Sequence, residues 1–409
     1  MKQNIAFNPL DYPLYLMAKP TGAVCNLNCA YCYYTGKESL YPNRKHYRMS
    51  DELLEKYVET YILSQPTPNV LFTWHGGEAL LRDVSFYRKA VSLQKKYGRG
   101  RHIENSLQTN GVLLNDEWCR FFKENDFLIG ISIDGPEDCH DIYRKNRGNA
   151  GTFRQVMRGI ELLHKHGVAF NTLGVIHNYN AKRPLEVYHF LKSIGSHYMQ
   201  FSPIVERLSP TGRLLSPSAC EEGERLGEWN VSPDDFGRFY TTIFDEWVLF
   251  DVSNYYVQLF DATLANWVGE APGVCIYAKE CGHAAVMEFN GDIYSCDHFV
   301  FPEYKLGNLR GNAGFIEMML SEKQQRFGRQ KHDALPTQCR ECGYLRLCNG
   351  ECPKNRIVKD RNGEPGLNYL CEGYRHYFEH VSPYMAFMAN ELQQNRPPAN
   401  VMKWVRGEY

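Results

Sequence analysis

The first half of the chain alternates short runs of β-branched and aromatic residues with longer stretches in which apolar residues recur at helical spacing. Runs of the first kind are typical of strands, and stretches of the second kind are typical of amphipathic helices. We expect strands at residues 13–19, 70–74, 103–109, 127–133, 169–176 and 198–204, and helices at residues 51–63, 84–97, 116–125, 153–166 and 183–193.

This alternation predicts an α/β fold with parallel strands, because a helix between two strands returns the chain to the same end of the sheet. Six strands are too few for a closed eight-stranded barrel. A partial (β/α)6 barrel of the TIM type and an open sheet with helices on both faces are both compatible with the pattern. In a parallel barrel the C-terminal ends of the strands carry the chemistry.

The fourth predicted helix has a capping-box pattern at its start. Thr152 precedes the helix, and Gln155 lies three positions later. In such a box the side chain at the first position accepts a hydrogen bond from a backbone amide of the first turn. We therefore expect the Thr152 hydroxyl to cap this helix.

Two further segments follow the sixth predicted strand. Residues 206–233 are rich in Ser, Pro, Gly and Glu, which predicts a loop over the barrel mouth. Residues 234–250 are amphipathic and predict a packed helix. We expect its repeated aromatic residues to be core residues, and these are Phe236, Phe239, Tyr240, Phe244 and Trp247.

Length and composition narrow the class of protein. The 409 residues are enough for two or three units, and the 43% hydrophobic and 23% charged residues are typical of a soluble globular protein. The net charge of −1 gives no field that would recruit nucleic acid or an anionic membrane. Without a signal-peptide pattern or a run of about 18 apolar residues, we expect a cytoplasmic protein. Its fourteen cysteines then indicate metal or redox chemistry rather than disulfides.

Three cysteines with C-x3-C-x2-C spacing follow the first predicted strand, at Cys25, Cys29 and Cys32. Four thiolates would close the shell of a zinc ion or an iron–sulfur cluster, whereas three leave one metal position open. An open iron of a [4Fe–4S] cluster can bind S-adenosylmethionine and pass it one electron, which produces a 5′-deoxyadenosyl radical. A zinc knuckle completed by a distant histidine is the alternative interpretation.

Three further motifs follow the second, third and fourth predicted strands. Residues 75–78 read His-Gly-Gly-Glu, residues 108–111 read Gln-Thr-Asn-Gly, and residues 132–135 read Ser-Ile-Asp-Gly. Glycine lets a backbone come close to a ligand, but Gly-Gly, Asn-Gly and Asp-Gly are also common in tight turns. Both interpretations are open on these residues alone.

A second group of eight cysteines lies between residues 275 and 371. Two four-thiolate sites would use all of them, whereas one zinc held by residues 339–352 would leave four without partners. We expect Cys119, on an aromatic helix face, to be a small core residue. The eight are Cys275, Cys281, Cys296, Cys339, Cys342, Cys348, Cys352 and Cys371.

The first cysteine loop, with Tyr31 and Tyr33 beside its last cysteine, resembles the radical S-adenosylmethionine superfamily. The resemblance favours the partial barrel and implies that Cys25, Cys29 and Cys32 hold a [4Fe–4S] cluster that binds S-adenosylmethionine. The Gly-Gly-Glu-Pro motif of the superfamily is present with alanine in place of proline. The residues that the resemblance assigns to the bound S-adenosylmethionine are Tyr31, Gly77, Glu78, Ser132, Arg144 and Val205.

The second cysteine group resembles the SPASM domain of peptide-modifying radical enzymes, including its Gly291-x4-Cys296 element. In that domain two interleaved sets of cysteines bind two auxiliary [4Fe–4S] clusters. Full thiolate ligation leaves no open iron, so such clusters transfer electrons rather than bind substrate. The resemblance implies a first set of Cys275, Cys281, Cys296 and Cys352, and a second set of Cys339, Cys342, Cys348 and Cys371.

Nearly the whole chain resembles the anaerobic sulfatase-maturating enzymes. The resemblance includes residues 106–111 (SLQTNG), residues 341–353 (ECGYLRLCNGECP) and the pair Cys296-Asp297. It implies oxidation of a cysteine or serine in an unfolded sulfatase polypeptide to Cα-formylglycine. The implied cofactors are S-adenosylmethionine and three [4Fe–4S] clusters, and the implied electron donor is a reduced flavodoxin or ferredoxin.

The same resemblance divides the chain into four parts. Residues 1–235 would form the radical S-adenosylmethionine barrel, 236–270 a helical linker, 271–378 the SPASM domain and 379–409 a C-terminal helical tail. Nucleic acid and membranes are not expected partners.

Asp297 is the residue that the resemblance places in catalysis. After a hydrogen atom leaves the substrate Cβ, the carbon radical must lose one electron and one thiol or hydroxyl proton. The cluster bound by Cys296 can take the electron, and the adjacent Asp297 can take the proton as a general base. A carboxylate that only caps a turn or a helix is the alternative role.

Two other functions fit the same cysteine pattern. Another SPASM peptide modifier, one that forms a thioether bond, would share every cluster ligand. A zinc-stabilised interaction protein would have no catalytic activity, and it would contain zinc in place of about twelve irons, the total for three four-iron clusters.

Overall fold

The computed structural model describes residues 13–34, 36–42 and 46–409. Residues 1–12, on which the expectation of no signal peptide depends, lie outside the described residues. Among the helices of the described part, none has both the length and the apolar composition needed to cross a membrane.

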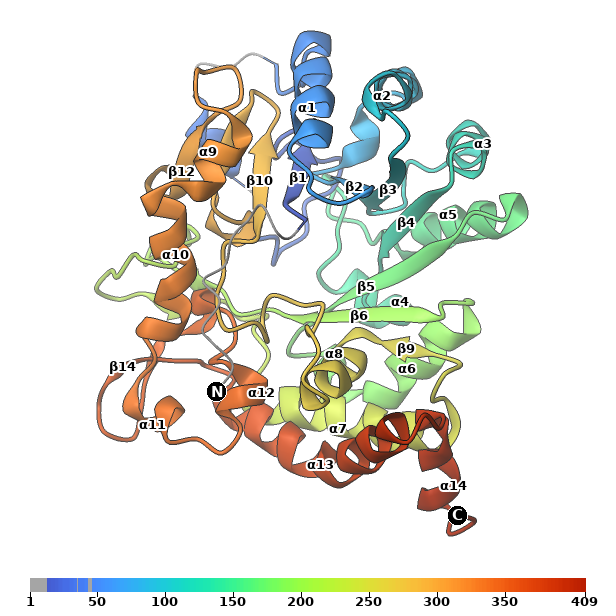
Figure 1. The fold of residues 1–409 in the computed structure, drawn as a ribbon, viewed down its shortest axis with the longest axis vertical. Helices are drawn as coiled ribbons and strands as arrows, with labels where there is room; N and C mark the ends of the chain where they lie inside the picture. Colours follow the sequence, from blue (N-terminus) through green and yellow to red (C-terminus); the bar gives the residue numbers. More distant parts are fainter. Residues whose placement is uncertain (1–12, 35, 43–45) are drawn as a thin grey trace.

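A ten-stranded sheet forms the centre of the molecule, and its strand order is β12-β11-β10-β1-β2-β3-β4-β5-β6-β9 (Figure 1). Strands β1 to β6 are neighbours in sequence order, and all five of their pairings are parallel. The ten strands are β1 (Tyr15–Lys19), β2 (Asn69–Trp74), β3 (His102–Thr109), β4 (Phe127–Ser132), β5 (Phe170–Ile176), β6 (Tyr198–Pro203), β9 (Tyr256–Val257), β10 (Ala284–Glu288), β11 (Asp292–Tyr294) and β12 (Lys305–Asn308).

Helices connect the first six strands and lie on the outer side of the curved sheet (Figure 1). The expected partial (β/α)6 barrel is confirmed, and the predicted bounds of its helices agree with the structure to within one residue. The connecting elements are η1 (Lys37–Leu40), α1 (Asp51–Leu63), η2 (Ala79–Leu81), α2 (Val84–Tyr97), α3 (Asp116–Glu124), α4 (Glu137–Asp141), α5 (Phe153–His166), η3 (Asn180–Lys182) and α6 (Pro184–Ser193).

Polar side chains define where the first three of the α-helices begin. Ser50, Asp83 and Asn115 precede α1, α2 and α3, and each accepts a hydrogen bond from the backbone amide three positions later. These bonds satisfy amides of the first helical turn that have no partner within the helix.

The capping box expected at the start of α5 is wrong. The Thr152 side chain makes no capping hydrogen bond, and its hydroxyl donates to the backbone carbonyl of Arg144 at 3.0 Å. The Asp141 carboxylate instead accepts hydrogen bonds from the amides of Thr152 and Phe153, at 2.7 and 2.9 Å. Because Asp141 serves the start of the helix, the Thr152 hydroxyl is available to brace the segment that carries Arg144.

The aromatic helix after the barrel is α7 (Pro233–Phe250), as predicted. Its rings contact rings of α8 (Gln258–Trp267) and of the long α13 (Cys371–Gln393), whose first residue is a predicted metal ligand. Cys119 is also fully buried, as expected of a core residue. The predicted aromatic residues of α7 are all buried, and they are Phe236, Phe239, Tyr240, Phe244 and Trp247.

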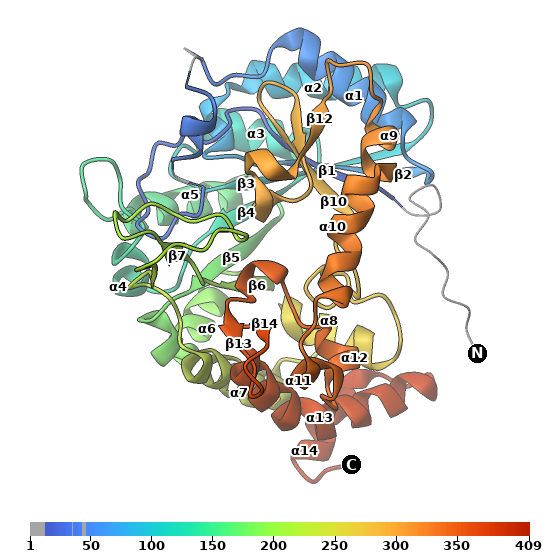
Figure 2. The same cartoon turned by 90° about the vertical axis from the view of Figure 1, so that its left-hand side faces the viewer.

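The cysteine-rich half of the chain joins the barrel's own sheet, which the sequence pattern did not predict. Strand β10 pairs with β1 in parallel, and β11 and β12 continue the sheet with antiparallel pairing. Figure 2 shows β10 and β12 beside β1, with α10 running from this region toward α11. The remaining elements are β7 (Arg207–Leu208), β8 (Arg225–Leu226), η4 (Asp297–Phe299), η5 (Pro302–Tyr304), α9 (Phe315–Leu320), α10 (Glu322–Asp333), α11 (Thr337–Arg340), α12 (Leu345–Cys348), η6 (Pro353–Asn355), β13 (Val358–Lys359), β14 (Pro365–Leu367), η7 (Pro398–Asn400) and α14 (Val401–Val405).

We predict that Phe244→Ala lowers the thermal unfolding midpoint of the protein. Phe244 is fully buried between α7, α8 and α13, and truncating a buried phenylalanine costs about 3–5 kcal/mol. Phe250→Ala on the same helix is the control, because Phe250 is 54% exposed. Circular dichroism melts of both variants under anaerobic conditions make the comparison, and equal midpoints would contradict a core role for this face of α7.

Candidate active site

Main-chain contacts hold the first cysteine loop against the loop after β2. The amides of Gly77 and Glu78 donate to the carbonyls of Gly22 and Val24, at 2.7 and 2.9 Å. A Cβ atom at Gly77 would lie 2.3 Å from the Val24 carbonyl oxygen, a distance that no side chain tolerates. The glycine is therefore needed to seat the loop that carries Cys25.

The Glu78 carboxylate is buried and accepts three hydrogen bonds from the protein. Its Oε1 accepts from the Leu80 amide at 2.9 Å and the Thr109 hydroxyl at 2.7 Å, and its Oε2 accepts from the Asn110 amide at 2.9 Å. Burial raises the pKa of Glu78, and these hydrogen bonds partly offset the rise. The side chain thus ties the ends of β2 and β3 together, and Oε2, which accepts a single hydrogen bond, keeps acceptor capacity for a ligand.

Tyr31, Asp134 and Arg144 form a buried cluster beside the cysteine loop. Arg144 donates to Asp134 from Nε and Nη2, both at 3.0 Å, and Tyr31 donates its hydroxyl to the same carboxylate. Burial acts against ionisation of Asp134, but the Arg144 guanidinium lowers the pKa of that carboxyl. The positive charge of Arg144 is close enough to Cys29 to act on its thiol. Two hydrogen bonds in one plane thus fix the guanidinium beside a predicted cluster ligand.

The other two residues predicted to bind the cofactor lie at strand ends. Ser132 ends β4, and its hydroxyl accepts a hydrogen bond from the Gln108 side chain at 2.9 Å. Val205 follows β6, and its carbonyl accepts from the Lys354 ammonium at 2.7 Å. Since β1 to β6 run parallel, both residues share one edge of the sheet with the cysteine loop.

The thiol chemistry of the first loop suits a metal cluster. All fourteen cysteines are free thiols. Burial, then the Glu78 carboxylate and neighbouring thiols, raise the pKa of Cys25 to about 12, and burial raises the pKa of Cys29 to about 11. A cationic cluster would supply the charge that lets such buried thiols bind as thiolates. The residues therefore fit the iron–sulfur cluster that the sequence implies.

The eight later cysteines lie in two groups whose members act on one another electrostatically. Where the pKa of such a thiol is raised, burial is the largest cause, and thiols of the same group often add to it. The two groups have the same members as the first and second sets, which supports the ligand assignment although it stays a prediction. One group joins Cys275, Cys281, Cys296 and Cys352, and the other joins Cys339, Cys342, Cys348 and Cys371.

Within residues 13–34, 36–42 and 46–409, no three His, Cys, Asp or Glu side chains gather closely enough to hold a single metal ion. Thiolates around a four-iron cluster bind different irons, so they lie farther apart than the ligands of one ion. The wide spacing of these thiols therefore argues against sites for a single metal ion, and it does not argue against four-iron clusters.

Asp297 lies where the two halves of the chain meet, in η4 directly after Cys296. Its Oδ1 forms an ion pair with the Lys19 ammonium at the end of β1, and its Oδ2 accepts a hydrogen bond from the Tyr33 hydroxyl. Burial alone would raise the pKa of Asp297, but the Lys19 charge holds it well below the usual value. The side chain is thus an anion held by two residues of the barrel.

Lys19 is fully buried, and its surroundings explain why a lysine is stable there. Its ammonium lies 3.3 Å from the centroid of the Tyr34 ring, and Tyr34 donates its hydroxyl to Glu288. Glu288 lies opposite Lys19 in the pairing of β1 with β10. A buried ammonium needs an anionic partner, and Asp297, in the segment after β11, is the ion-pair partner of Lys19. Burial raises the pKa of Glu288, and the Lys19 charge acts to lower it.

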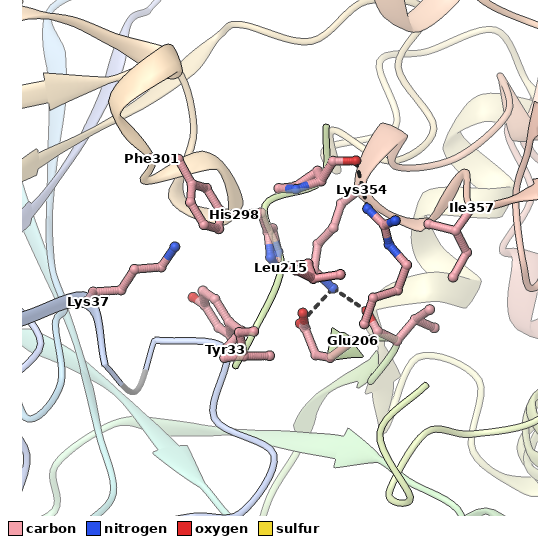
Figure 3. Close-up of a pocket in the computed structure, with 12 residues that line it drawn as sticks. Tyr33, Lys37, Glu206, Leu215, His298, Phe301, Lys354 and Ile357 are labelled. Atoms are coloured by element: carbon pink, nitrogen blue, oxygen red, sulfur yellow. Dashed lines mark hydrogen bonds and ion pairs between the residues drawn. The ribbon is translucent and has the colours of Figure 1, made fainter. Parts of the chain in front are cut away.

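A cavity lies where β6 ends (Figure 3), and its lining includes Tyr33, which donates a hydrogen bond to Asp297, and His298, which follows Asp297 in the chain. Tyr33 and His298 form one side of it, and Leu214, Leu215 and Pro217 contribute from the segment 206–233, which lies over the mouth as expected. The full lining is Tyr33, Lys37, Val205, Glu206, Arg207, Leu214, Leu215, Pro217, His298, Phe301, Lys354 and Ile357.

Lys354 links the cysteine-rich half to the barrel across this cavity (Figure 3). Its ammonium contacts the Glu206 carboxylate and the Val205 carbonyl, both at 2.7 Å. These contacts place one positive and one negative side chain on the cavity wall where β6 ends.

Two more cavity residues have lowered pKa values, which favour the neutral form of each side chain. Burial and then the Lys19 charge lower the pKa of Lys37 to about 7. The enclosing protein and then the Lys354 charge lower the pKa of His298 to about 4. Near neutral pH, His298 is therefore neutral, and Lys37 is present in both protonation states.

Reasoning from the sequence did not single out the charged residues around Asp297 and the cavity. A lysine at the end of an apolar strand, as in the segment 15–19 (YLMAK), is a signal that points to Lys19. Lys37 lies in η1, Lys354 lies in η6 and Glu206 lies between β6 and β7. None of the three belongs to a recognised motif, and only the tertiary structure brings them together.

Known proteins resemble both halves of the chain. A profile of the Radical SAM superfamily matches residues 20–191, and a profile of an iron–sulfur cluster-binding domain, SPASM, matches residues 279–343. A serine-type anaerobic sulfatase-maturating enzyme of Bacteroides thetaiotaomicron is 58% identical over 97% of this chain and 96% of its own length. The chain belongs to the anaerobic sulfatase-maturating enzymes. A cysteine-type member from Clostridium perfringens is 31% identical over 93% of this chain and 100% of its own length.

Solved structures agree with this membership. Native anSMEcpe with bound AdoMet and Cp18Cys peptide has a TM-score of 0.80 and 31% identity, covering 93% of this chain and 99% of that chain. Streptococcus suis SuiB bound to S-adenosylmethionine, with a TM-score of 0.58 and 14% identity, shares the fold alone. As an anaerobic sulfatase-maturating enzyme, this protein is a radical S-adenosylmethionine enzyme, so the hypothesis of a zinc-stabilised interaction protein is wrong.

We predict that Lys19→Met destabilises this anaerobic sulfatase-maturating enzyme, because it leaves the Asp297 anion without its cation. Removing one partner of a buried ion pair costs about 3–5 kcal/mol. The double variant Lys19→Met/Asp297→Asn should recover part of the loss, since it leaves no unpaired charge. Thermal melts of the two single variants and the double variant form a double-mutant cycle, and purely additive effects would disprove the coupling.

Proposed function

We propose that the enzyme oxidises a serine or cysteine side chain of an unfolded sulfatase polypeptide to Cα-formylglycine. The observation that carries the proposal is the position of Asp297, an anion that follows Cys296 and accepts a hydrogen bond from the cavity residue Tyr33. Family membership supports the same reaction, because the named relatives are sulfatase-maturating enzymes and a solved relative holds AdoMet and a peptide together.

S-adenosylmethionine, bound with a [4Fe–4S] cluster at Cys25, Cys29 and Cys32, supplies the radical that removes one hydrogen atom from the substrate Cβ. The protein's part is to seat and orient this cofactor. Arg144 uses Nε and Nη2 for Asp134, which leaves Nη1 outside that fork for a carboxylate of the cofactor. The proposed contacts are those of the resemblance, namely Tyr31, Gly77, Glu78, Ser132, Arg144 and Val205.

Asp297 takes the substrate proton in this proposal. The hydroxyl or thiol of the substrate must lose its proton while the neighbouring carbon loses an electron, and a base has to lie within hydrogen-bond reach. Because Lys19 occupies Oδ1, the oxygen available to the substrate is Oδ2, which accepts from Tyr33. A substrate hydroxyl that enters the cavity can take the place of the Tyr33 hydroxyl on this oxygen.

The electron leaves on the same side as the proton. Cys296 belongs to the first set and directly precedes Asp297 in the chain. A proton acceptor and an electron acceptor are thereby connected by one peptide bond, so both products of the oxidation have a nearby destination. This neighbourhood supports Asp297 as a catalytic base over a role that is limited to capping a turn or helix, because its carboxylate contacts the side chains of Lys19 and Tyr33.

We also propose that serine is an accepted substrate residue. The relative at 58% identity is serine-type, whereas a cysteine-type relative is 31% identical. Serine and cysteine differ in the acidity of the proton to be removed, since a thiol gives up its proton far more readily than a hydroxyl. The serine assignment rests on the relative at 58% identity.

Three [4Fe–4S] clusters, a reduced flavodoxin- or ferredoxin-type donor and a cytoplasmic location complete the proposal. The eleven cysteines assigned to clusters are free thiols in three groups, which supports the cluster number. Reductive cleavage of the cofactor needs one electron from outside, which requires a donor. The division into parts at residues 235, 270 and 378 belongs to the same proposal.

We predict that Asp297→Asn uncouples the two halves of the reaction. The variant should still form 5′-deoxyadenosine and methionine but should produce at least about 100-fold less formylglycine, the lower bound for loss of a general base. Asp245→Asn is the control, because Asp245 is 53% exposed on α7. Both products are quantified after anaerobic incubation with a sulfatase peptide. Full formylglycine yield from Asp297→Asn would remove this residue from the mechanism.

A pair of sulfatase peptides tests the substrate proposal. Conversion to the aldehyde changes the peptide mass by about −2 units from serine and about −18 units from cysteine. We expect the reconstituted enzyme to produce the change in the serine peptide, as measured by mass spectrometry. Conversion of the cysteine peptide alone would disprove the serine assignment. A thioether cross-link in either peptide would indicate a different peptide-modifying reaction.

A further inference from the structure

A buried lysine of α10 holds the loop that begins the first set of cysteines. Lys331 is 0% exposed, and its ammonium donates hydrogen bonds to the backbone carbonyls of Cys275, Ile276 and Ala278, at 2.7, 2.7 and 2.5 Å. The function proposed above makes no use of this residue. Its ammonium lies in the loop that carries the predicted cluster ligand Cys275, and it is not exposed to water.

The hydrogen bonds show that Lys331 carries its positive charge. Three carbonyl oxygens can only accept, so three N–H groups are needed to serve them. The ammonium form has three such groups, whereas the neutral amine has two. Burial lowers the pKa of Lys331, but a neutral Lys331 would leave one of these three carbonyls without its donor, so the hydrogen bonds favour the ammonium.

Helix α10 also packs closely on another ligand of the first set. The Cys281 amide donates to the Gly328 carbonyl at 3.1 Å, and a Cβ atom at Gly328 would lie 2.7 Å from the Cys281 carbonyl oxygen. Gly328 lies about one helical turn before Lys331, and at this point α10 packs against the cysteine loop. The charge of Lys331 acts on the thiols of both Cys275 and Cys281.

The charges around the two cysteine sets are distributed unequally. Glu351 and Arg356 act on thiols of both sets, since Glu351 acts on Cys348 and Cys352, and Arg356 acts on Cys281 and Cys339. Those two residues therefore do not distinguish one set from the other. Asp297 acts on Cys296 of the first set as an anion, but its charge is paired with that of Lys19. The hydrogen bonds of Lys331, by contrast, all go to the loop of the first set.

A buried cation beside an iron–sulfur cluster favours its reduced form, because reduction adds one negative charge. The attraction is strong where the local dielectric constant is low and weak where water screens it. Net charge, hydrogen bonding and solvent exposure are the means by which a protein sets the potential of such a cluster. Lys331 therefore acts in the direction of a higher reduction potential at the first set.

We propose that Lys331 makes the cluster of the first set the preferred electron acceptor of the two auxiliary clusters. This inference rests on the proposed function and adds the residue that sets the potential of the cluster that would receive the electron. As the substrate O–H or S–H bond breaks, the proton goes to Asp297, a carbon–oxygen or carbon–sulfur π bond forms, and the remaining electron reduces the cluster that Cys296 binds. One electron leaves the carbon radical and one enters the cluster, so the step is balanced.

The test is a redox titration of the reconstituted enzyme without peptide, followed by electron paramagnetic resonance. Lys331→Gln removes the charge but keeps two N–H donors for the loop carbonyls. We expect one of the three cluster signals to shift to a lower midpoint potential while the other two keep theirs. Arg329→Gln, an exposed charge on the same helix, is the matched control and should shift none of them.

Iron and sulfide contents are measured first, so that a lost cluster is not mistaken for a shifted one. If Lys331→Gln loses a cluster, Lys331→Arg replaces it, and this variant should keep the wild-type potentials because it keeps the charge. Unchanged potentials in Lys331→Gln, a shift of the second set, or a lowered potential in Lys331→Arg would overturn the proposal. Since no peptide is present, failure of the proposed function would appear separately, as unmodified sulfatase peptides.

Discussion

Strand β1 pairs with β10 along all five of its residues, and this parallel pairing joins the two halves of the active site. The end of β1 leads into the first cysteine loop, whereas β10 and β11 lead to Cys296 and Asp297. The register places Lys19 opposite Glu288 and lets its ammonium reach Asp297. The distance between the predicted radical cluster and the predicted base is therefore set by backbone hydrogen bonds and not by a flexible linker between domains.

The buried charges of Lys19 and Asp297 at this junction are better explained by their role in orienting the Asp297 carboxylate than by a contribution to the stability of the fold. Desolvation of an ion pair often costs as much as the attraction between the charges returns, so apolar residues would stabilise the fold equally well. Lys19 and Asp297 nevertheless occupy the contact between β1 and the segment after β11. The pair holds an anion in one orientation next to the cavity residues Tyr33 and His298. A base needs such a fixed orientation, and an apolar contact could not provide it.

Local signals in the sequence were enough for the alternation of strands and helices and for the cysteine motifs, whereas family resemblance favoured the barrel over an open sheet. The periodicity of apolar residues in β1 to β6 and in their helices depends on neighbours within a few residues. Cys25, Cys29 and Cys32 all lie within one loop. The pairing of β1 with β10, the partners of Lys19 and the replacement of the Thr152 cap by Asp141 depend on residues far apart in the chain or on competition between side chains. The periodicity of apolar residues contains no information about such long-range contacts. The division of the eight later cysteines into two sets came from family resemblance.

The central claim is that the radical chemistry acts on the Cβ hydrogen of the substrate residue at this cavity. Its most direct test uses a sulfatase peptide whose reacting serine carries deuterium at Cβ. After one anaerobic turnover, the account predicts 5′-deoxyadenosine that contains one deuterium atom, together with a peptide aldehyde in equal amount. Unlabelled 5′-deoxyadenosine formed alongside the aldehyde would contradict it, because the hydrogen would then have come from another position.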